Sequence, residues 1–250
     1  MMKNWFLAVA FFLGLGGHWA QGQVERKYTT HVQGWYIYKG DHFFTDKWGL
    51  NSELHLRRAR FLDPLQLVAI GGIHYKLTPD VQVTGSYTFT HTHPYGEAPA
   101  RNHFTEHRLT EQLQLKAAYG PFLLQHRFRL EQRFIKRPAQ ENATFLNRTR
   151  YQLKAVLPLL GATLEEKEPF LVASNEVFIN FGENVQANIF DQNRAYVGVG
   201  YKLSQAASFE VGYLHQLVQQ SNGINFLNNH TLQFMVSYNL TFKPKPTIPN

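Results

Sequence analysis

Arginine and glutamate recur at every second position in several segments, so their side chains share one face wherever the chain is extended. The densest run carries Arg127, Arg129, Glu131 and Arg133. Guanidinium and carboxylate groups at this spacing can pair across neighbouring strands, and surplus arginines can bind an anion. The residues predicted to form one such charge network are Glu106, Arg108, Arg127, Arg129, Glu131, Arg133, Arg148, Arg150, Glu176 and Arg194.

This predicted network has two interpretations. One is a packed ladder of arginine–carboxylate pairs that fills and stiffens an interior, because an uncompensated buried ion costs several kcal/mol. The other is a site for an anionic solute or a lipid headgroup, which the excess of arginine over glutamate favours. The sequence predicts no catalytic residue and no cofactor.

Histidine offers a weaker candidate site. His91 and His93 put two imidazoles on one face of an extended segment, and His103 and His107 follow them. Zinc could use such a pair, but no third ligand stands at a diagnostic spacing. Metal binding is therefore not predicted.

A serine motif raises the alternative of a lipid-acting enzyme. Ser221-Asn222-Gly223 resembles part of the catalytic motif of outer-membrane phospholipase A, whose serine follows a histidine by two residues. Here Gln219 occupies that position, and a serine without a base is a poor nucleophile. The segment is first of all expected to be a turn.

The elements that position these residues are β-strands, because the dominant sequence period is two. Apolar and polar residues alternate over the segments 65–77, 81–90, 122–134, 195–203 and 232–242. Segments of this kind run for about 10–14 residues, whereas strands of soluble proteins average about 5–6. A membrane-spanning strand needs about 9–11 residues, and strands in hydrocarbon must close into a barrel.

We therefore predict an all-β fold, an antiparallel transmembrane up-and-down β-barrel of about 10–12 strands. Eleven strands can be placed, and the segment 30–38 is the weakest. Bacterial barrels almost always have an even number of strands, so one of the eleven is expected to be wrong. Connections alternate between tight turns and longer polar loops, which is the outer-membrane arrangement; the longer acidic segment 165–168 departs from it. A soluble sandwich or lipocalin-like barrel is the competing fold.

Composition agrees with one exported domain. The chain has 250 residues, 14% of them aromatic, only 17% charged and none of them cysteine. The absence of cysteine excludes disulfide scaffolds and zinc–thiolate sites. The net charge of +7 comes from single lysines and arginines rather than a basic run, so nucleic acid is not expected as a partner.

The first residues predict a cleaved secretory signal peptide, residues 1–22. Lys3 precedes an apolar stretch from Trp5 to Leu15, and Ala20-Gln21-Gly22 places small residues at a cleavage site before Gln23. No cysteine follows, so a lipoprotein is excluded. Residues 23–242 are predicted to form the barrel and the proline-containing residues 243–250 a disordered tail.

Several of these segments, taken together, resemble the bacterial family catalogued as domain of unknown function 2490. Their order and spacing carry the resemblance, which covers nearly all of the chain after the signal peptide. They are Glu106-His107-Arg108-Leu109, the run from Arg127 to Phe134, Arg148-Thr149-Arg150-Tyr151, Asn175-Glu176-Val177-Phe178 and Phe190-Asp191-Gln192-Asn193-Arg194. The resemblance implies an outer-membrane barrel, often found in Bacteroidetes, and supplies no catalytic residues.

The expected function is that of an integral outer-membrane barrel of a Gram-negative bacterium, either a narrow or plugged pore or a structural or surface protein. Two alternatives stay open: an enzyme acting on lipid or lipopolysaccharide, and a soluble periplasmic binding protein. The expected partners are outer-membrane lipid and the barrel-assembly machinery. Leu130 and Val236 are expected to face lipid, and Glu111 is an outward exception that indicates an interface or a bulge.

Overall fold

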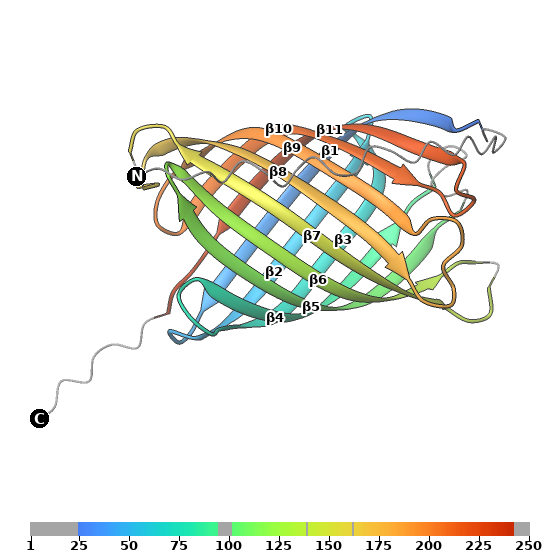
Figure 1. Cartoon of the computed structure of the whole chain (residues 1–250), viewed down its shortest axis with the longest axis horizontal. Helices are drawn as coiled ribbons and strands as arrows, with labels where there is room; N and C mark the ends of the chain where they lie inside the picture. The colour runs from blue at the N-terminus through green and yellow to red at the C-terminus, as the bar shows by residue number, and fades with distance from the viewer. Residues whose placement is uncertain (1–24, 95–101, 139, 162, 243–250) are drawn as a thin grey trace, which may run out of the picture.

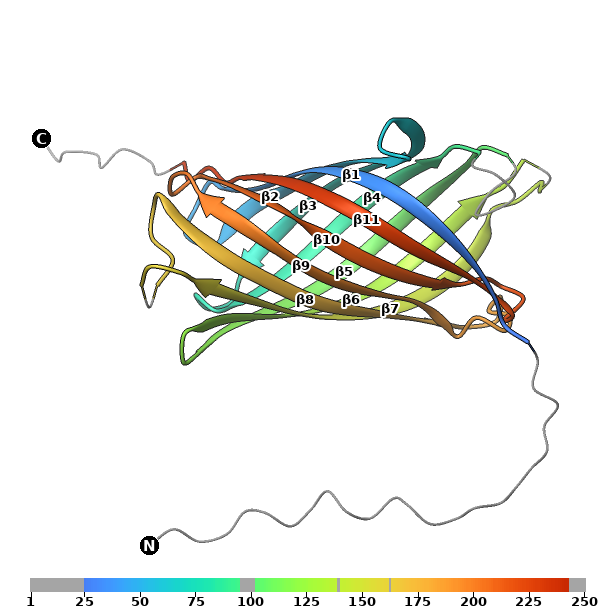
Figure 2. The same ribbon diagram turned by 90° about the horizontal axis from the view of Figure 1, so that it is seen from above.

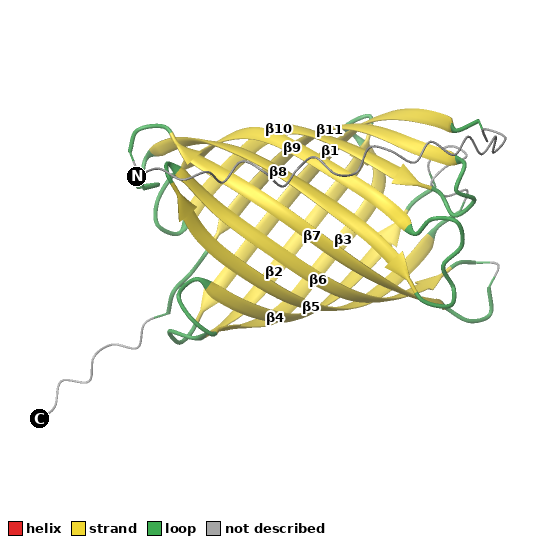
Figure 3. Ribbon diagram, in the orientation of Figure 1, coloured by secondary structure: helices red, strands yellow, loops and turns green. Residues whose placement is uncertain are grey.

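The computed structural model describes residues 25–94, 102–138, 140–161 and 163–242. The predicted signal peptide 1–22 and tail 243–250 lie outside the described residues. Every regular element in the described part is a β-strand (Figure 3). The described residues contain no helix of the length and apolarity that crossing a membrane would require.

The described residues form eleven strands, which are long and strongly tilted (Figure 1). They are β1 (Lys27–Phe43), β2 (Trp48–Ala59), β3 (Asp63–Lys76), β4 (Val81–Thr92), β5 (Phe104–Tyr119), β6 (Phe122–Lys136), β7 (Thr144–Pro158), β8 (Glu168–Phe181), β9 (Phe190–Lys202), β10 (Ala207–Gln219) and β11 (Asn225–Tyr238).

The strands close into a barrel in which each pairs with its neighbours in the sequence. All of these pairs are antiparallel except the closing one, where β1 lies parallel to β11 from Lys27↔Asn225 to Lys39↔Ser237 (Figure 2). The expectation of an even number was therefore wrong, and the doubtful segment 30–38 is the centre of a 17-residue strand. An odd number of up-and-down strands makes the first and last run in the same direction, so the closure is parallel.

The two ends of the barrel differ in their connections. The short-turn end carries the described residues 44–47, 77–80, 120–121, 159–161, 163–167 and 203–206. The long-loop end carries the described residues 60–62, 93–94, 102–103, 137–138, 140–143, 182–189 and 220–224. Tight turns have visible causes: Gly120 has a φ of 55°, and Thr78 Oγ1 accepts a hydrogen bond from the Val81 amide at 3.1 Å. Because the strand number is odd, β1 begins at the long-loop end and β11 ends at the short-turn end.

The two faces of the sheet have opposite chemistry. Outward side chains are mostly apolar and accessible, as for Leu130, which is 39% exposed, and Val236, which is 52% exposed. Inward side chains such as Glu131, which is 1% exposed, are mostly polar and buried. Glu111 points outward and accepts a hydrogen bond from Gln132, and the pairing of β5 shows no register shift there. The exception is thus a carboxylate on the outer surface and not a bulge.

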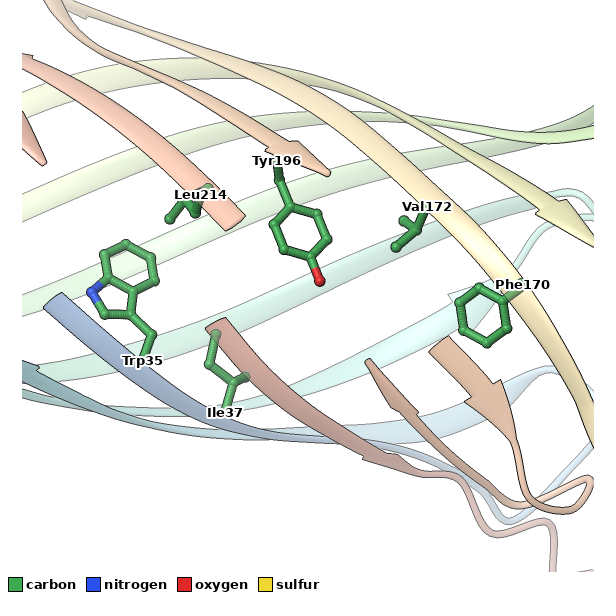
Figure 4. Packing of buried hydrophobic residues seen from close by; sticks show 6 residues of the cluster. All are labelled: Trp35, Ile37, Phe170, Val172, Tyr196 and Leu214. Carbon is green, nitrogen blue, oxygen red and sulfur yellow. The ribbon is translucent and has the colours of Figure 1, made fainter. Parts of the chain in front are cut away.

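The interior also contains an apolar cluster, which the sequence did not predict. Trp35 and Ile37 of β1 belong to one cluster with inward residues of β8, β9 and β10, among them Phe170 and Tyr196 (Figure 4). Glycines make room for these rings, since a Cβ at Gly200 would collide with the ring of Phe170. The cluster fills part of the barrel interior with packed side chains.

Candidate functional site

The centre of the charge network is Glu131 on β6. Its carboxylate accepts hydrogen bonds from Arg148 and Arg150 of β7, with N–O distances of 2.6 Å in both salt bridges. Arg108 of β5 approaches the same carboxylate at 3.5 Å. Two flanking strands therefore direct three guanidinium groups at one buried carboxylate.

Glu176 and Glu106 extend the network to either side. Glu176 on β8 accepts hydrogen bonds from Arg150 at 2.7 Å and from Arg127 at 2.9 Å. Glu106 on β5 pairs with Arg108 at 2.6 Å and with Arg133 at 2.7 Å. Because Arg150 and Arg108 each touch two carboxylates, the pairs form one continuous chain across the barrel interior.

Strand register explains why these groups meet. Glu131 stands directly opposite Arg148, and Arg129 directly opposite Arg150, in the β6–β7 pair. Two arginines directly opposite each other would repel. Here they point to different partners: Arg150 donates hydrogen bonds to Glu131 and Glu176. Arg129 donates a hydrogen bond to Gln112 at 2.6 Å. The network thus forms because alternate residues of each strand face inward, and because an arginine can reach residues diagonally across the neighbouring strand as well as the one directly opposite.

The structure places all ten predicted network residues on the inward face. Eight of them are joined by ion pairs, directly or through one another, into this interior cluster. Arg129 instead pairs with Glu53 of β2. Arg194 makes no ion pair or hydrogen bond within the described residues; its guanidinium lies 4.7 Å from the ring centroid of Phe178. The same ring also supports Arg150 at 4.2 Å and Arg148 at 5.1 Å, and it is fully buried.

Other charged residues of the interior were not predicted as site residues. Asp191 on β9 pairs with Arg148 at 2.6 Å, and Glu53 on β2 lies 3.9 Å from Arg129. Lys154 and Glu210 form a separate pair at 3.0 Å. Glu53 has the right parity and could have been found from alternation. Asp191 has the parity opposite to that of Arg194 and faces inward because the pairing of β8 with β9 shifts register beside it.

Two cavities lie on opposite sides of this layer. The larger, about 250 Å³, lies toward the long-loop end, where Leu227 and Phe104 line it. The smaller, about 130 Å³, lies toward the short-turn end, beside Glu210 and Met235. Their shared wall consists of Trp35, His55, Arg129, Arg150 and Arg194. The network and the aromatic residues thus separate the interior into two compartments.

The remaining candidates from the sequence lie at the long-loop end. His103 comes close to His91 and His93, with ring-centroid distances of 4.7–5.4 Å among the three. Burial lowers the pKa of His93, and its two histidine neighbours lower that pKa further. His107 is not in this group; it hydrogen-bonds to Tyr87.

The serine segment forms a turn, as expected. Gly223 has a φ of 73°, and Asn222 Oδ1 accepts hydrogen bonds from the amides of Ile224 and Asn225. Gln219 donates to the carbonyl of Gly223 at 3.0 Å. These contacts give each motif residue except Ser221 a turn-forming role and offer no base for its hydroxyl.

Fold and interior together define a closed β-barrel with an apolar exterior and a charged, largely filled interior. Residues 32–228, well over half of the chain, match the family described as Protein of unknown function (DUF2490), so the chain belongs to this family. No curated protein and no solved structure matches the chain.

Proposed function

We propose that the protein is an integral outer-membrane β-barrel whose interior is closed to bulk flow by the charge network. It then serves as a structural or surface barrel, or as a very narrow pore, and its partners are outer-membrane lipid and the machinery that assembles barrels. The observation that supports this most is the distribution of polarity around a closed sheet, with an apolar exterior and ion pairs inside.

The exterior has the properties that lipid contact requires. Large apolar side chains such as Leu109, Phe128 and Val199 are 44–52% exposed on the outward face. In water such a surface would promote association, whereas a membrane barrel presents an apolar band of about 25 Å. A lipocalin-like soluble barrel has the reverse arrangement, with its apolar face turned inward. Strands of 12–17 residues are long enough to cross a bilayer.

The interior supports closure rather than open conduction. Glu131, Arg148, Arg150 and Glu176 are all less than 9% exposed, so solvent reaches little of the layer that they form. The apolar cluster around Trp35 and Tyr196 occupies further space. A barrel of about eight strands is just wide enough for its side chains to fill it, whereas porins of about 16–18 strands leave an aqueous channel. The eleven strands here lie between these cases, and large charged and aromatic side chains take up much of the additional room.

Membrane fractionation combined with gel migration tests the proposal. We expect the protein in the outer-membrane fraction, migrating faster before heating than after it, because a folded barrel binds less detergent and is more compact. Recovery in the soluble periplasmic fraction would contradict it. The purified barrel in a planar bilayer should show no large steady conductance; a wide open pore would contradict closure while leaving the location intact.

A further inference from the structure

Two arginines beside the larger cavity have no carboxylate oxygen within 4.0 Å among the described residues. Arg57 lies over the ring of Trp35 with its Cζ 4.0 Å from the centroid, and Arg194 lies 5.1 Å from the same centroid. Arg57 donates to Gln66 at 2.7 Å, and the Nε atoms of both arginines are buried without a hydrogen-bond partner. Both guanidinium groups therefore lie against the indole of Trp35, and each has an N–H donor without a hydrogen-bond acceptor in the described part of the protein.

The interior as a whole carries an excess of positive charge. The charged strand residues that line the two cavities or pair with those residues comprise ten cations and six carboxylates within the described part. They are Lys39, Arg57, Arg108, Arg127, Arg129, Arg133, Arg148, Arg150, Lys154 and Arg194, against Glu53, Glu106, Glu131, Glu176, Asp191 and Glu210. Buried cations without counter-charges are costly, so an anion in the cavity would be stabilised.

We propose that the larger cavity binds a phosphate group between Arg57 and Arg194, either as free phosphate or as the phosphomonoester of a lipid headgroup. Two guanidinium forks suit the tetrahedral oxygens of phosphate, and cation–π contacts with Trp35 hold the forks in place. About 250 Å³ accommodates a phosphate group with a small substituent. This site depends on the closed interior and not on the membrane location, so its failure would leave the outer-membrane proposal intact.

Trp35 supplies the assay. From residue 23 onward the chain has only Trp35 and Trp48, so the variant Trp48→Phe leaves Trp35 as the single fluorophore. Inorganic phosphate should change its emission saturably in the refolded barrel, while chloride at equal ionic strength should not. Adding Arg57→Gln or Arg194→Gln should weaken binding about tenfold or more, since a charge-assisted hydrogen bond contributes about 1.5–3 kcal/mol.

Controls distinguish the two phosphate sources and guard against misfolding. Arg60→Gln, in the exposed turn where Arg60 pairs with Asp63, should leave phosphate binding unchanged. Vesicles containing phosphatidic acid, compared with phosphatidylcholine alone, test the headgroup source. Both cavity variants should retain heat-modifiable migration, because neither breaks an ion pair. An emission unaffected by phosphate and by phosphatidic acid, or equal binding by all variants, would overturn the proposal.

A second site rests on different residues. The imidazoles of His91, His93 and His103 place one nitrogen each within 4.8 Å of the others. His91 is the last residue but one of β4, and His103 immediately precedes β5, so the third histidine lies at the same end of the barrel as the pair. Three nitrogens from neutral imidazoles, with a fourth position free, form a common donor set for zinc. We propose that this trio binds a borderline divalent cation such as Zn²⁺.

Cobalt is a suitable probe, because tetrahedral Co²⁺ gives strong visible absorption bands. The refolded barrel should bind Co²⁺ with these bands, and Zn²⁺ should displace it. His103→Ala should abolish the bands. The control His126→Ala should not, because His126 lies away from the three histidines and is hydrogen-bonded to Tyr151. Bands that persist in His103→Ala, or absence of any Co²⁺ bands in the unmodified barrel, would overturn this assignment.

Discussion

Substituting Glu131 by alanine tests the charge network at its centre. The side chain is 1% exposed and faces three guanidinium groups, from Arg148, Arg150 and Arg108. Removing one partner of a buried ion pair costs about 3–5 kcal/mol, because the remaining charge stays buried without compensation. Since Arg148 and Arg150 keep Asp191 and Glu176, part of the charge is still neutralised, so we expect about 3 kcal/mol.

The measurement is urea unfolding of the refolded barrel in vesicles, followed by the loss of the fast-migrating form on gels. Glu131→Gln, which keeps the shape and one acceptor oxygen, should fall between the wild type and Glu131→Ala. Glu166→Ala is the matched control, because Glu166 accepts one surface hydrogen bond from the Gln205 amide. A change for Glu131→Ala no larger than that of Glu166→Ala would refute the reasoning that the ion pairs are structural.

Two further predictions concern the faces of the sheet. Gly200→Ala should destabilise the barrel by about 1–3 kcal/mol, because the added methyl group would collide with the ring of Phe170. Gly71→Ala should have little effect, because the space around its Cβ is open. Equal free energies of unfolding for the two variants would contradict this packing. Leu130→Arg and Val236→Arg should each impair assembly, because an arginine facing lipid near the bilayer midplane costs about 2–4 kcal/mol. Normal amounts of both variants in the outer membrane would show that these faces do not contact lipid.

Sequence periodicity was sufficient to predict the barrel and the inward face of the charge network. A period of two assigns each side chain to a face, so Arg127, Arg129, Glu131 and Arg133 could be grouped without knowing their neighbours. The strand order placed these residues on neighbouring strands, but the individual pairs, such as Glu131 opposite Arg148, depend on a register that the sequence did not predict. Asp191 was missed because the alternation of β9 places it on the face opposite to Arg194, and only the register shift between β8 and β9 lets it face inward.

Closure and interior packing were not predictable in the same way. The parallel pairing of β1 with β11 joins residues far apart in the sequence, and local periodicity carries no information about it. Trp35 and Ile37 point inward, while Tyr36 and Tyr38 of the other parity also carry large side chains, so β1 shows no alternation between apolar and polar residues here. A glycine at the inward position 200 indicates that another group lies close to the backbone there, but only the fold reveals that this group is the ring of Phe170.

The most direct test of the central claim, a barrel that crosses the outer membrane, is cysteine labelling on intact cells. The chain has no cysteine, so single-cysteine variants have no background. Glu183→Cys lies in an exposed loop at the long-loop end, and Gln205→Cys lies in an exposed turn at the short-turn end. We predict that a membrane-impermeant maleimide labels Glu183→Cys on intact cells and Gln205→Cys only after permeabilisation. Equal labelling of the two before permeabilisation, or labelling of neither until the membrane is opened, would contradict a barrel with its ends on opposite sides of the outer membrane.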